Sequence, residues 1–387
     1  MARLSQLTIY PIKSTSGIHL ESAQVETQGL AFDRRFLIAD SSGAMITGRA
    51  SPELLRITSA LNHNGLTLHY PNKPSLDLVY SAFDMRNAHS QVWSDQFQSY
   101  TTIDTANTWI SEILKAPAQL LYCGEQSRRV GGEIQTPLSF ADAYPALLIS
   151  EASLEELNRR SPRQNTMAQF RPNLVVTDCE LFAEDGWKKI KIGEVIFEVS
   201  KPCERCVMTT VRSDGAYNTF DEQQEPLATL AKFRANNDGG VFFGQNLKPL
   251  NEGTISVTDS IEVLETQKKA AYYNMSSNMY DNRPNQKEAS QSSSASIKEL
   301  TITLNGKQFT GNNQETLLSQ AEAAGINLPF KCRAGTCGTC KSTLINGEVH
   351  QTESRALARH NASENKAENK ILPCCCIPLS DIELSTP

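Results

Sequence analysis

The chain has 387 residues, 39% hydrophobic and 21% charged, which is typical of a globular protein with two or three domains. Its 37 lysines and arginines against 43 aspartates and glutamates give a net charge of −6, without the basic block that nucleic-acid binding requires. No stretch reaches roughly 18 apolar residues and the N-terminus alternates apolar with polar residues, so we expect a cytoplasmic protein that binds neither nucleic acid nor membrane.

The first 270 residues are predicted to be rich in strands. Residues 7–10 are expected to form an opening strand, and other short segments alternate apolar and polar residues in the same way, namely 66–70, 174–177, 195–199 and 254–258. Helices are expected at 105–114 and 150–159. We place a boundary near residue 120, which gives two domains, 1–120 and 121–270.

A polar segment separates this part from the C-terminus. Residues 271–296 contain few branched apolar residues and many serines and asparagines, a composition that favours a flexible linker. We expect a further domain at 297–387.

The C-terminal domain should begin with a hairpin and a helix. Asn305-Gly306 lies between two alternating segments, 300–304 and 307–310, and this dipeptide supplies the positive φ angles of a tight hairpin. A helix is expected at 316–324, before Gly325.

Six of the ten cysteines lie in this domain. Cys332, Cys337 and Cys340 are separated by four and then two residues, which is the plant-type spacing of a 2Fe-2S cluster. We predict Cys374 as the fourth iron ligand, with Cys376 as the alternative. A zinc site is the competing hypothesis, but zinc loops favour paired short spacings or histidine partners.

The charge of this domain bears on how it transfers electrons. From residue 297 to the end the sequence has nine basic and nine acidic residues. A neutral, tethered domain favours electron delivery to a site in the same chain.

A flavin reductase would need a flavin-binding segment and a glycine-rich nucleotide loop, and the sequence has neither.

The pair Cys203-x-x-Cys206 marks a second candidate site. Three ordinary readings are half of a zinc site, a thioredoxin-like dithiol, and buried thiols on a strand. A thioredoxin-like dithiol places its first cysteine at a helix N-terminus, whereas residues 207–211, Val-Met-Thr-Thr-Val, are predicted to be a strand.

Together with this pair, several motifs resemble the MOSC family of molybdenum-cofactor proteins. They are Pro11-Ile-Lys-Ser14, Gly29-Leu-Ala-Phe-Asp-Arg34, Gln169-Phe-Arg-Pro-Asn173, Lys201 to Val211, and Phe243-Gly-Gln-Asn246. The resemblance implies a mixed α/β, strand-rich fold: a MOSC N-terminal barrel-like subdomain, a MOSC β-barrel core, and a β-grasp 2Fe-2S ferredoxin domain.

The resemblance also implies site residues. Molybdenum would be held by a pterin dithiolene and one thiolate, that of Cys206, with Cys203 as its neighbour; sulfur ligands suit this metal. The pterin phosphate would be held by charged and polar groups, and the candidates are Lys13, Ser14, Arg34, Asp142, Arg171 and Asn173.

The implied activity is reduction of N-hydroxylated compounds, such as hydroxylaminopurines, amidoximes and hydroxylamines. Electrons would pass from an external NAD(P)H-dependent flavoprotein reductase through the 2Fe-2S cluster to the molybdenum cofactor (molybdopterin). Two alternatives stay open: a cofactor or sulfur carrier, and a plain ferredoxin-type electron carrier fused to a binding domain.

Overall fold

The computed structural model describes residues 1–131, 134–212, 219–236, 240–272, 298–313, 315–326, 328–330, 338–351 and 369–386. Contacts divide the chain into two units. One comprises Met1–Cys203, Met208–Pro226 and Phe243–Ala270, and the other comprises Glu204–Val207, Leu227–Phe242 and Ala271–Pro387. The predicted linker lies outside the described residues except for 271 and 272. Among the described residues, no helix is long and apolar enough to span a membrane.

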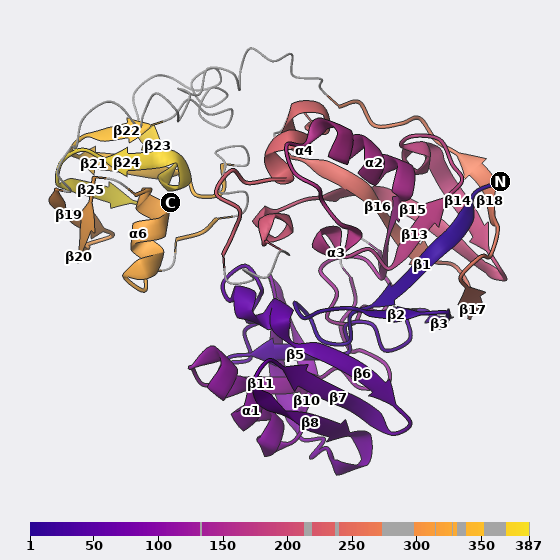
Figure 1. Ribbon diagram of the computed structural model, residues 1–387. Helices are drawn as coiled ribbons and strands as arrows, with labels where there is room; N and C mark the ends of the chain where they lie inside the picture. Colours follow the sequence, from indigo (N-terminus) through magenta and orange to yellow (C-terminus); the bar gives the residue numbers. More distant parts are fainter. Residues whose placement is uncertain are drawn as a thin grey trace. The chain divides into compact units, whose positions relative to one another are not determined.

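The first unit is built around an eight-stranded sheet in the order β18-β14-β15-β16-β12-β13-β1-β2. Its apolar side chains alternate along the strands, as in β15, and pack into one core that includes Leu7, Ile190 and Phe197. Figure 1 shows the indigo strand β1 within this sheet. The strands are β1 (Arg3–Ile9), β2 (Ile18–Leu20), β12 (Ala146–Ser150), β13 (Leu174–Thr177), β14 (Trp187–Ile192), β15 (Val195–Glu204), β16 (Phe242–Pro249) and β18 (Ile261–Thr266).

Helix α2 (Glu151–Arg160) connects β12 to β13, the parallel pair of the sheet. Ser150 caps the helix by accepting a hydrogen bond from the backbone N–H of Ser153. The buried carboxylate of Glu184, in the 3-10 turn η3 (Ala183–Gly186), accepts hydrogen bonds from both serine hydroxyls. A short helix, α3 (Met167–Phe170), precedes β13. β1 and β13 are antiparallel neighbours, so the C-terminal end of β1 lies beside the N-terminal end of β13.

The N-terminal part of this unit adds two sheets with their own core, which includes Phe36, Leu68 and Ile110. The four-stranded sheet has the order β5-β11-β10-β9 and the three-stranded one β6-β7-β8. Helix α1 (Asp104–Leu114) packs on them with η1 (Pro52–Arg56) and η2 (Tyr80–Ala82). The strands are β5 (Phe36–Ala39), β6 (Thr58–Asn62), β7 (Gly65–Tyr70), β8 (Lys73–Val79), β9 (Asn87–Val92), β10 (Asp95–Thr101) and β11 (Gln119–Tyr122). A third sheet pairs β17 (Gly253–Ser256), β3 (Ser22–Glu26) and β4 (Gly29–Leu30).

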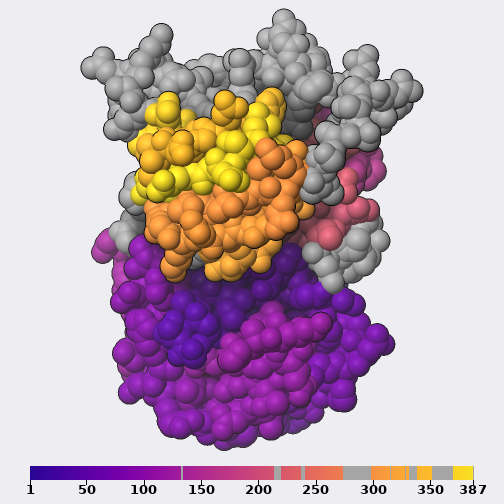
Figure 2. Space-filling model, turned by 90° about the vertical axis from the view of Figure 1, so that its left-hand side faces the viewer, coloured from indigo at the N-terminus to yellow at the C-terminus, as the bar shows by residue number. Residues whose placement is uncertain are grey.

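The described residues from 298 onward fold around a five-stranded sheet in the order β20-β19-β25-β21-β23, with β22 and β24 paired beside it. Asn305 and Gly306 both have positive φ, 49° and 78°, so the predicted hairpin turn is confirmed. Helix α6 (Leu317–Ala323) covers the core, and Figure 2 shows this domain in orange to yellow. The strands are β19 (Glu299–Leu304), β20 (Lys307–Asn312), β21 (Ser342–Asn346), β22 (Val349–Gln351), β23 (Lys370–Ile371), β24 (Cys376–Pro378) and β25 (Ile382–Ser385).

The strand-rich prediction is confirmed. Apart from the strand expected at 207–211, the expected strands and helices are all present, with ends shifted by a few residues; the helix expected at 105–114, for example, spans Asp104–Leu114. Among the described helices, α3 and α4 (Leu227–Phe233) have no counterpart among the predicted elements, and α4 belongs to the second unit.

Candidate functional site

Lys13 and Ser14 lie in a tight turn after β1. Lys13 N–H donates to the carbonyl of Phe36, and Ser14 takes a left-handed conformation at φ 68°. The turn buries the Lys13 side chain, whose Nζ donates to Phe140 O at 2.9 Å and to Asp142 Oδ1 at 2.6 Å. Burial lowers the pKa of Lys13, and the contact with Asp142 opposes this shift. The ammonium group is therefore held in a fixed place inside the protein.

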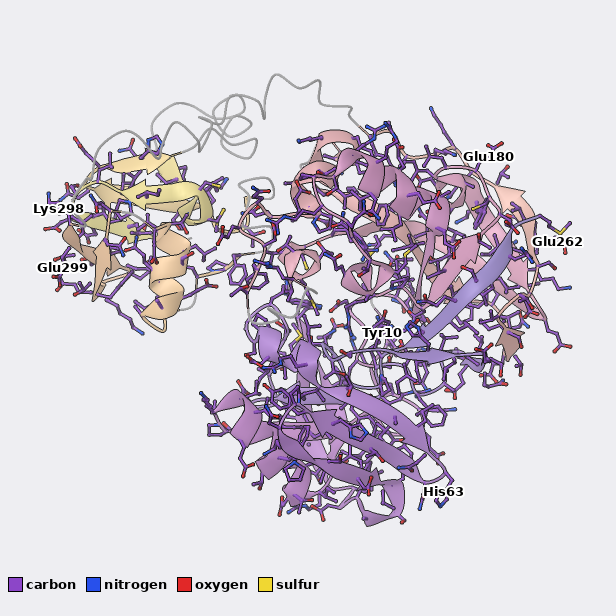
Figure 3. All side chains as sticks on the ribbon, viewed as in Figure 1. Tyr10, His63, Glu180, Glu262, Lys298 and Glu299 are labelled. Carbon is purple, nitrogen blue, oxygen red and sulfur yellow. The ribbon has the colours of Figure 1, made fainter. Side chains whose placement is uncertain are left out.

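Arg34 and Arg171 meet over the ring of Tyr10, the residue that follows β1 and is labelled in Figure 3. Their guanidinium carbons lie 4.4 and 4.1 Å from the ring centroid, within cation–π distance. Both arginines have left-handed backbones, with φ of 48° and 56°. Together with Lys13 they bring cations from three separate segments into one region, here called the cation cluster (Lys13, Arg34, Arg171).

The two arginines differ in how many of their donors the protein uses. Arg34 Nη1 donates to Asp33 Oδ2 at 2.6 Å and to Asn173 Oδ1 at 2.9 Å. Arg171 Nη1 donates to Thr15 O at 2.6 Å, and the guanidinium group has five N–H donors in all. Burial lowers the pKa of Arg171 to about 10. A partly buried arginine with donors that no described residue uses is suited to an anionic ligand.

Asn173, which immediately precedes β13, fixes the position of Arg34. It is 1% exposed. Its Nδ2 donates to Thr8 O at 3.0 Å, and its Oδ1 accepts from Arg34 and from the backbone N–H of Leu147 at 3.2 Å. Because both ends of the amide bind protein groups, Asn173 positions Arg34.

Asp142 lies at the exposed edge of the cluster, with a side chain that is 70% exposed. Besides Lys13 it accepts a hydrogen bond from Trp93 Nε1 at 2.9 Å. The guanidinium of Arg49 stacks on the Trp93 ring at 3.9 Å, and Arg49 makes no hydrogen bond or ion pair with any residue that the structure describes. Arg49 is thus a fourth cation near this edge.

Four of these contributors, namely Arg49, Arg129, Tyr10 and Trp93, were not predicted from the sequence. Arg129 is buried and donates to the carbonyls of Ser139, Ala141 and Asp142, so it holds the segment that carries Asp142. Tyr10 and Trp93 supply the rings on which the arginines lie. No spacing rule relates these residues, because Arg129 acts through backbone carbonyls and Tyr10 and Trp93 act through their rings.

Cys203 lies near the end of β15, Cys206 just after it, and both are half-buried. The strand predicted for residues 207–211 is wrong: Val207–Thr210 form a 3-10 turn, closed by a hydrogen bond from Val211 N–H to Met208 O. Thr209 and Thr210 are buried there, so tertiary packing overrides the preference of β-branched residues for strands. Among the described residues, no group of three or more histidine, cysteine and acidic side chains could hold a metal, so the described part of the chain offers Cys203 and Cys206 no zinc cage.

In the C-terminal domain the structure brings two predicted ligands together. The Sγ atoms of Cys340 and Cys374 lie 3.3 Å apart. Metal–sulfur bonds of about 2.3 Å put neighbouring sulfurs on a tetrahedral metal roughly 3.8 Å apart, so these two thiols are near the spacing for a shared iron. Cys376 is fully buried in the domain core. Cys332 and Cys337 lie outside the described residues.

Three families match consecutive parts of the chain. Residues 1–117 match the MOSC N-terminal beta barrel domain, 135–262 the MOSC domain, and 302–379 the 2Fe-2S iron-sulfur cluster binding domain.

Several curated proteins are similar to this chain. The chain is 32% identical to the mitochondrial amidoxime-reducing component 1 of Mus musculus over 67% of its own length and 82% of the relative. It is 33% identical to the mitochondrial amidoxime reducing component 2 of Bos taurus over 60% and 72%. It is also 32% identical to the molybdenum cofactor sulfurase of Oryza sativa subsp. japonica, over 65% of the chain and 33% of that protein.

Proposed function

Because the chain belongs to the family of MOSC-domain proteins that includes the mitochondrial amidoxime-reducing components, we propose that it is a molybdenum-cofactor-dependent reductase of N-hydroxylated compounds. Its C-terminal 2Fe-2S domain provides a redox group within the same chain. The observation that supports the proposal most directly is the cation cluster, a preformed anion site in a protein whose family associates with a phosphate-bearing cofactor.

The cation cluster fits the phosphate of the pterin. Arg171 has unused donors, Lys13 presents a fixed ammonium group, and Ser14 adds a hydroxyl in the same turn. Arginine forks give paired hydrogen bonds to phosphate oxygens. Asp142 and Asn173 orient Lys13 and Arg34. We assign the thiolate of Cys206 as the protein ligand to molybdenum, with Cys203 beside it in sequence.

The reaction cleaves an N–O bond and leaves N–H and water, which consumes two electrons and two protons. When bound, the molybdenum cofactor supplies two-electron chemistry at the N–O bond, and the 2Fe-2S cluster supplies electrons singly. The chain contributes the groups that bind and orient these cofactors. For the cluster we assign Cys332, Cys337, Cys340 and Cys374; the short distance between the last two sulfurs supports Cys374 over Cys376.

Electrons would come from an external NAD(P)H-dependent flavoprotein reductase, reaching the 2Fe-2S domain first. The neutral charge of that domain and the polar segment that joins it to the rest of the chain favour delivery within one molecule. The cytoplasmic location stays a prediction.

Metal analysis and one variant test the proposal. Protein made in a host that synthesises the molybdenum cofactor should contain one molybdenum and two irons per chain and should reduce benzamidoxime to benzamidine with an artificial electron donor. Cys206→Ser should lose this reduction and keep its iron. Absence of molybdenum from the wild-type protein would reject the reductase and leave the sulfur-carrier and electron-carrier alternatives, and unimpaired turnover by Cys206→Ser would reject the assigned metal ligand.

A further inference from the structure

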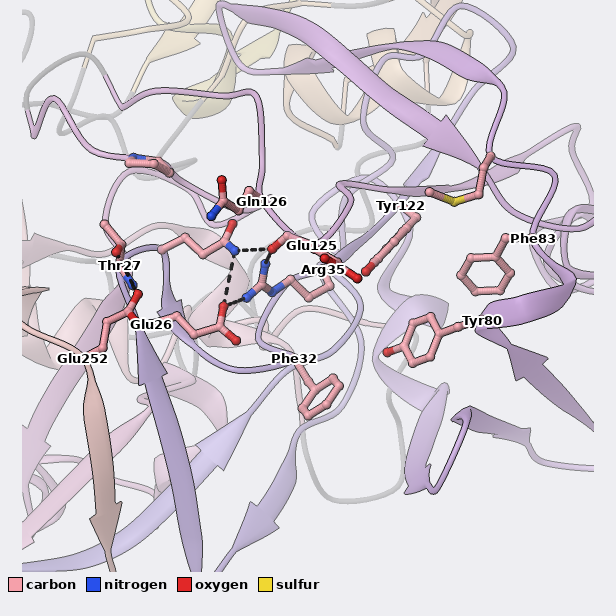
Figure 4. Close-up of a pocket in the computed structure, with 13 residues that line it drawn as sticks. Glu26, Thr27, Phe32, Arg35, Tyr80, Phe83, Tyr122, Glu125, Gln126 and Glu252 are labelled. Carbon is pink, nitrogen blue, oxygen red and sulfur yellow. Dashed lines mark hydrogen bonds and ion pairs between the residues drawn. The ribbon is translucent and has the colours of Figure 1, made fainter.

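A pocket lies in the first unit, with a volume of ≈ 830 Å³. None of its lining residues belongs to the cation cluster or contacts Asp142 or Asn173 through a hydrogen bond or ion pair. Figure 4 shows aromatic side chains at one end and acidic and amide side chains at the other. The pocket is therefore amphipathic and distinct from the cofactor site proposed above.

Three packed rings form the aromatic end. Tyr80 and Phe83 lie 5.5 Å apart edge to face, Phe83 and Tyr122 lie 5.7 Å apart in the same way, and Tyr80 and Tyr122 lie 5.8 Å apart. Each ring fixes the others, so this wall is rigid. Burial raises the pKa of Tyr80 to about 12, and its hydroxyl therefore stays protonated and uncharged at neutral pH.

Two large apolar side chains at this end are held in unusual positions. Phe32 is 44% exposed and Met85 is 43% exposed. Both have left-handed backbones, with φ of 65° and 52°, a conformation that costs a residue with a Cβ about 1 kcal/mol. Strained residues that present apolar surface to a cavity are characteristic of ligand sites.

Carboxylates dominate the polar end. Glu26 pairs with the buried guanidinium of Arg35, which also donates to Glu125 O at 2.9 Å. Glu252 Oε1 accepts hydrogen bonds from Thr27 N at 3.2 Å and Thr27 Oγ1 at 3.0 Å. Neither Glu125 nor Glu252 has an ion pair with a cation among the described residues. Three carboxylates thus face one arginine, and the pocket carries a net negative charge.

We propose that this pocket binds a small organic cation with a flat apolar body, the body lying against Phe32, Tyr80 and Tyr122 and the cationic group near Glu252. The rings attract a cation as well as an apolar surface, and the unpaired carboxylates exclude anions of the same shape. This function goes beyond N–O reduction and does not depend on it.

Ligand-observed NMR titration of the full chain with three probes of similar shape tests the proposal. Benzylammonium, benzyl alcohol and benzoate share a ring and differ in charge, and we expect binding to weaken in that order. Glu252→Gln should weaken benzylammonium binding about threefold, since a partly exposed charge pair is lost. Phe32→Ser should weaken binding of both benzylammonium and benzyl alcohol about fivefold, since a ring contact is lost.

Matched variants elsewhere in the unit serve as controls. Glu262→Gln removes an exposed carboxylate from β18, at the position labelled in Figure 3, and Leu264→Ser removes an exposed apolar side chain from the same strand. Both should leave the titrations unchanged. Benzoate binding as tightly as benzylammonium, or affinities that do not respond to Glu252→Gln and Phe32→Ser more than to the controls, would overturn the proposal.

Discussion

The substitution Arg171→Met tests whether Arg171 binds the cofactor or only stabilises the fold. The pKa of Arg171 lies at about 10, below the ordinary 12.5, so the folded protein holds this charge at a cost of up to about 3 kcal/mol, less where water screens it. Methionine retains the apolar stem and removes the charge. A protein that gained only its own stability from Arg171 would have little reason to bury it.

The interactions that the variant loses are of similar size. The hydrogen bond to Thr15 O, 2.6 Å long, contributes about 1.5–3 kcal/mol, and the contact with the Tyr10 ring, 4.1 Å from its centroid, about 0.5–2 kcal/mol. The pKa shift already includes the attraction of Tyr10, so the hydrogen bond to Thr15 O is the term that nearly offsets the cost of burial. We expect the free energy of unfolding of protein made without the molybdenum cofactor to change by no more than about 1 kcal/mol.

Cofactor retention should respond far more. Loss of one charge-assisted contact with phosphate weakens binding by about tenfold to a hundredfold, so the molybdenum-to-iron ratio of Arg171→Met should fall sharply while iron stays constant. Arg3→Met, which removes an exposed arginine paired with Asp178, is the matched control and should change neither quantity. An unchanged molybdenum-to-iron ratio in Arg171→Met, with unfolding easier by more than about 3 kcal/mol, would show that Arg171 is a structural residue.

Four more variants test other parts of the molecule. Cys374→Ser should lose the visible absorption of the 2Fe-2S cluster, whereas Cys376→Ala should keep it and lose about 1–2 kcal/mol of domain stability, because it leaves a small cavity in the core; the reverse pattern in the absorption spectra would make Cys376 the ligand. Trp93→Leu should lower the molybdenum content about threefold and leave stability within about 0.5 kcal/mol, because Trp93 is partly exposed and orients Arg49 and Asp142. Burial raises the pKa of Glu184, so its contribution is most favourable below the ordinary carboxyl pKa and is lost as pH rises. The free energy of unfolding of the wild type, relative to Glu184→Gln, should therefore fall between pH ~4 and ~7, and denaturant titrations with equal differences at both pH values would contradict this.

Local patterns predicted most of the secondary structure. Alternating apolar residues gave β7 and β13 to within a residue, and the demand for positive φ at Asn305 and Gly306 located the hairpin. The 3-10 turn after Cys206 could not be read in the same way. Its β-branched residues match a strand, and the burial that bends them depends on contacts made elsewhere in the chain.

The same distinction applies to the candidate site: some of its residues could be predicted from the sequence, and others could not. Resemblance to a family drew attention to Lys13, Arg34 and Arg171, and the structure places them together. The parts that support them, such as Arg129 beneath the Asp142 segment, act through backbone carbonyls. Every residue type has a backbone carbonyl, so a hydrogen bond to a carbonyl leaves no pattern in a single sequence.

Ser14, Arg34 and Arg171 share one property with consequences for protein engineering: all three adopt backbone conformations that glycine would adopt more easily. Glycine at any of them would relieve local strain and remove a group from the proposed cofactor site. Selection for heat resistance alone would therefore tend to replace these three residues by glycine. A library designed to stabilise this protein should hold these three positions fixed and vary residues elsewhere.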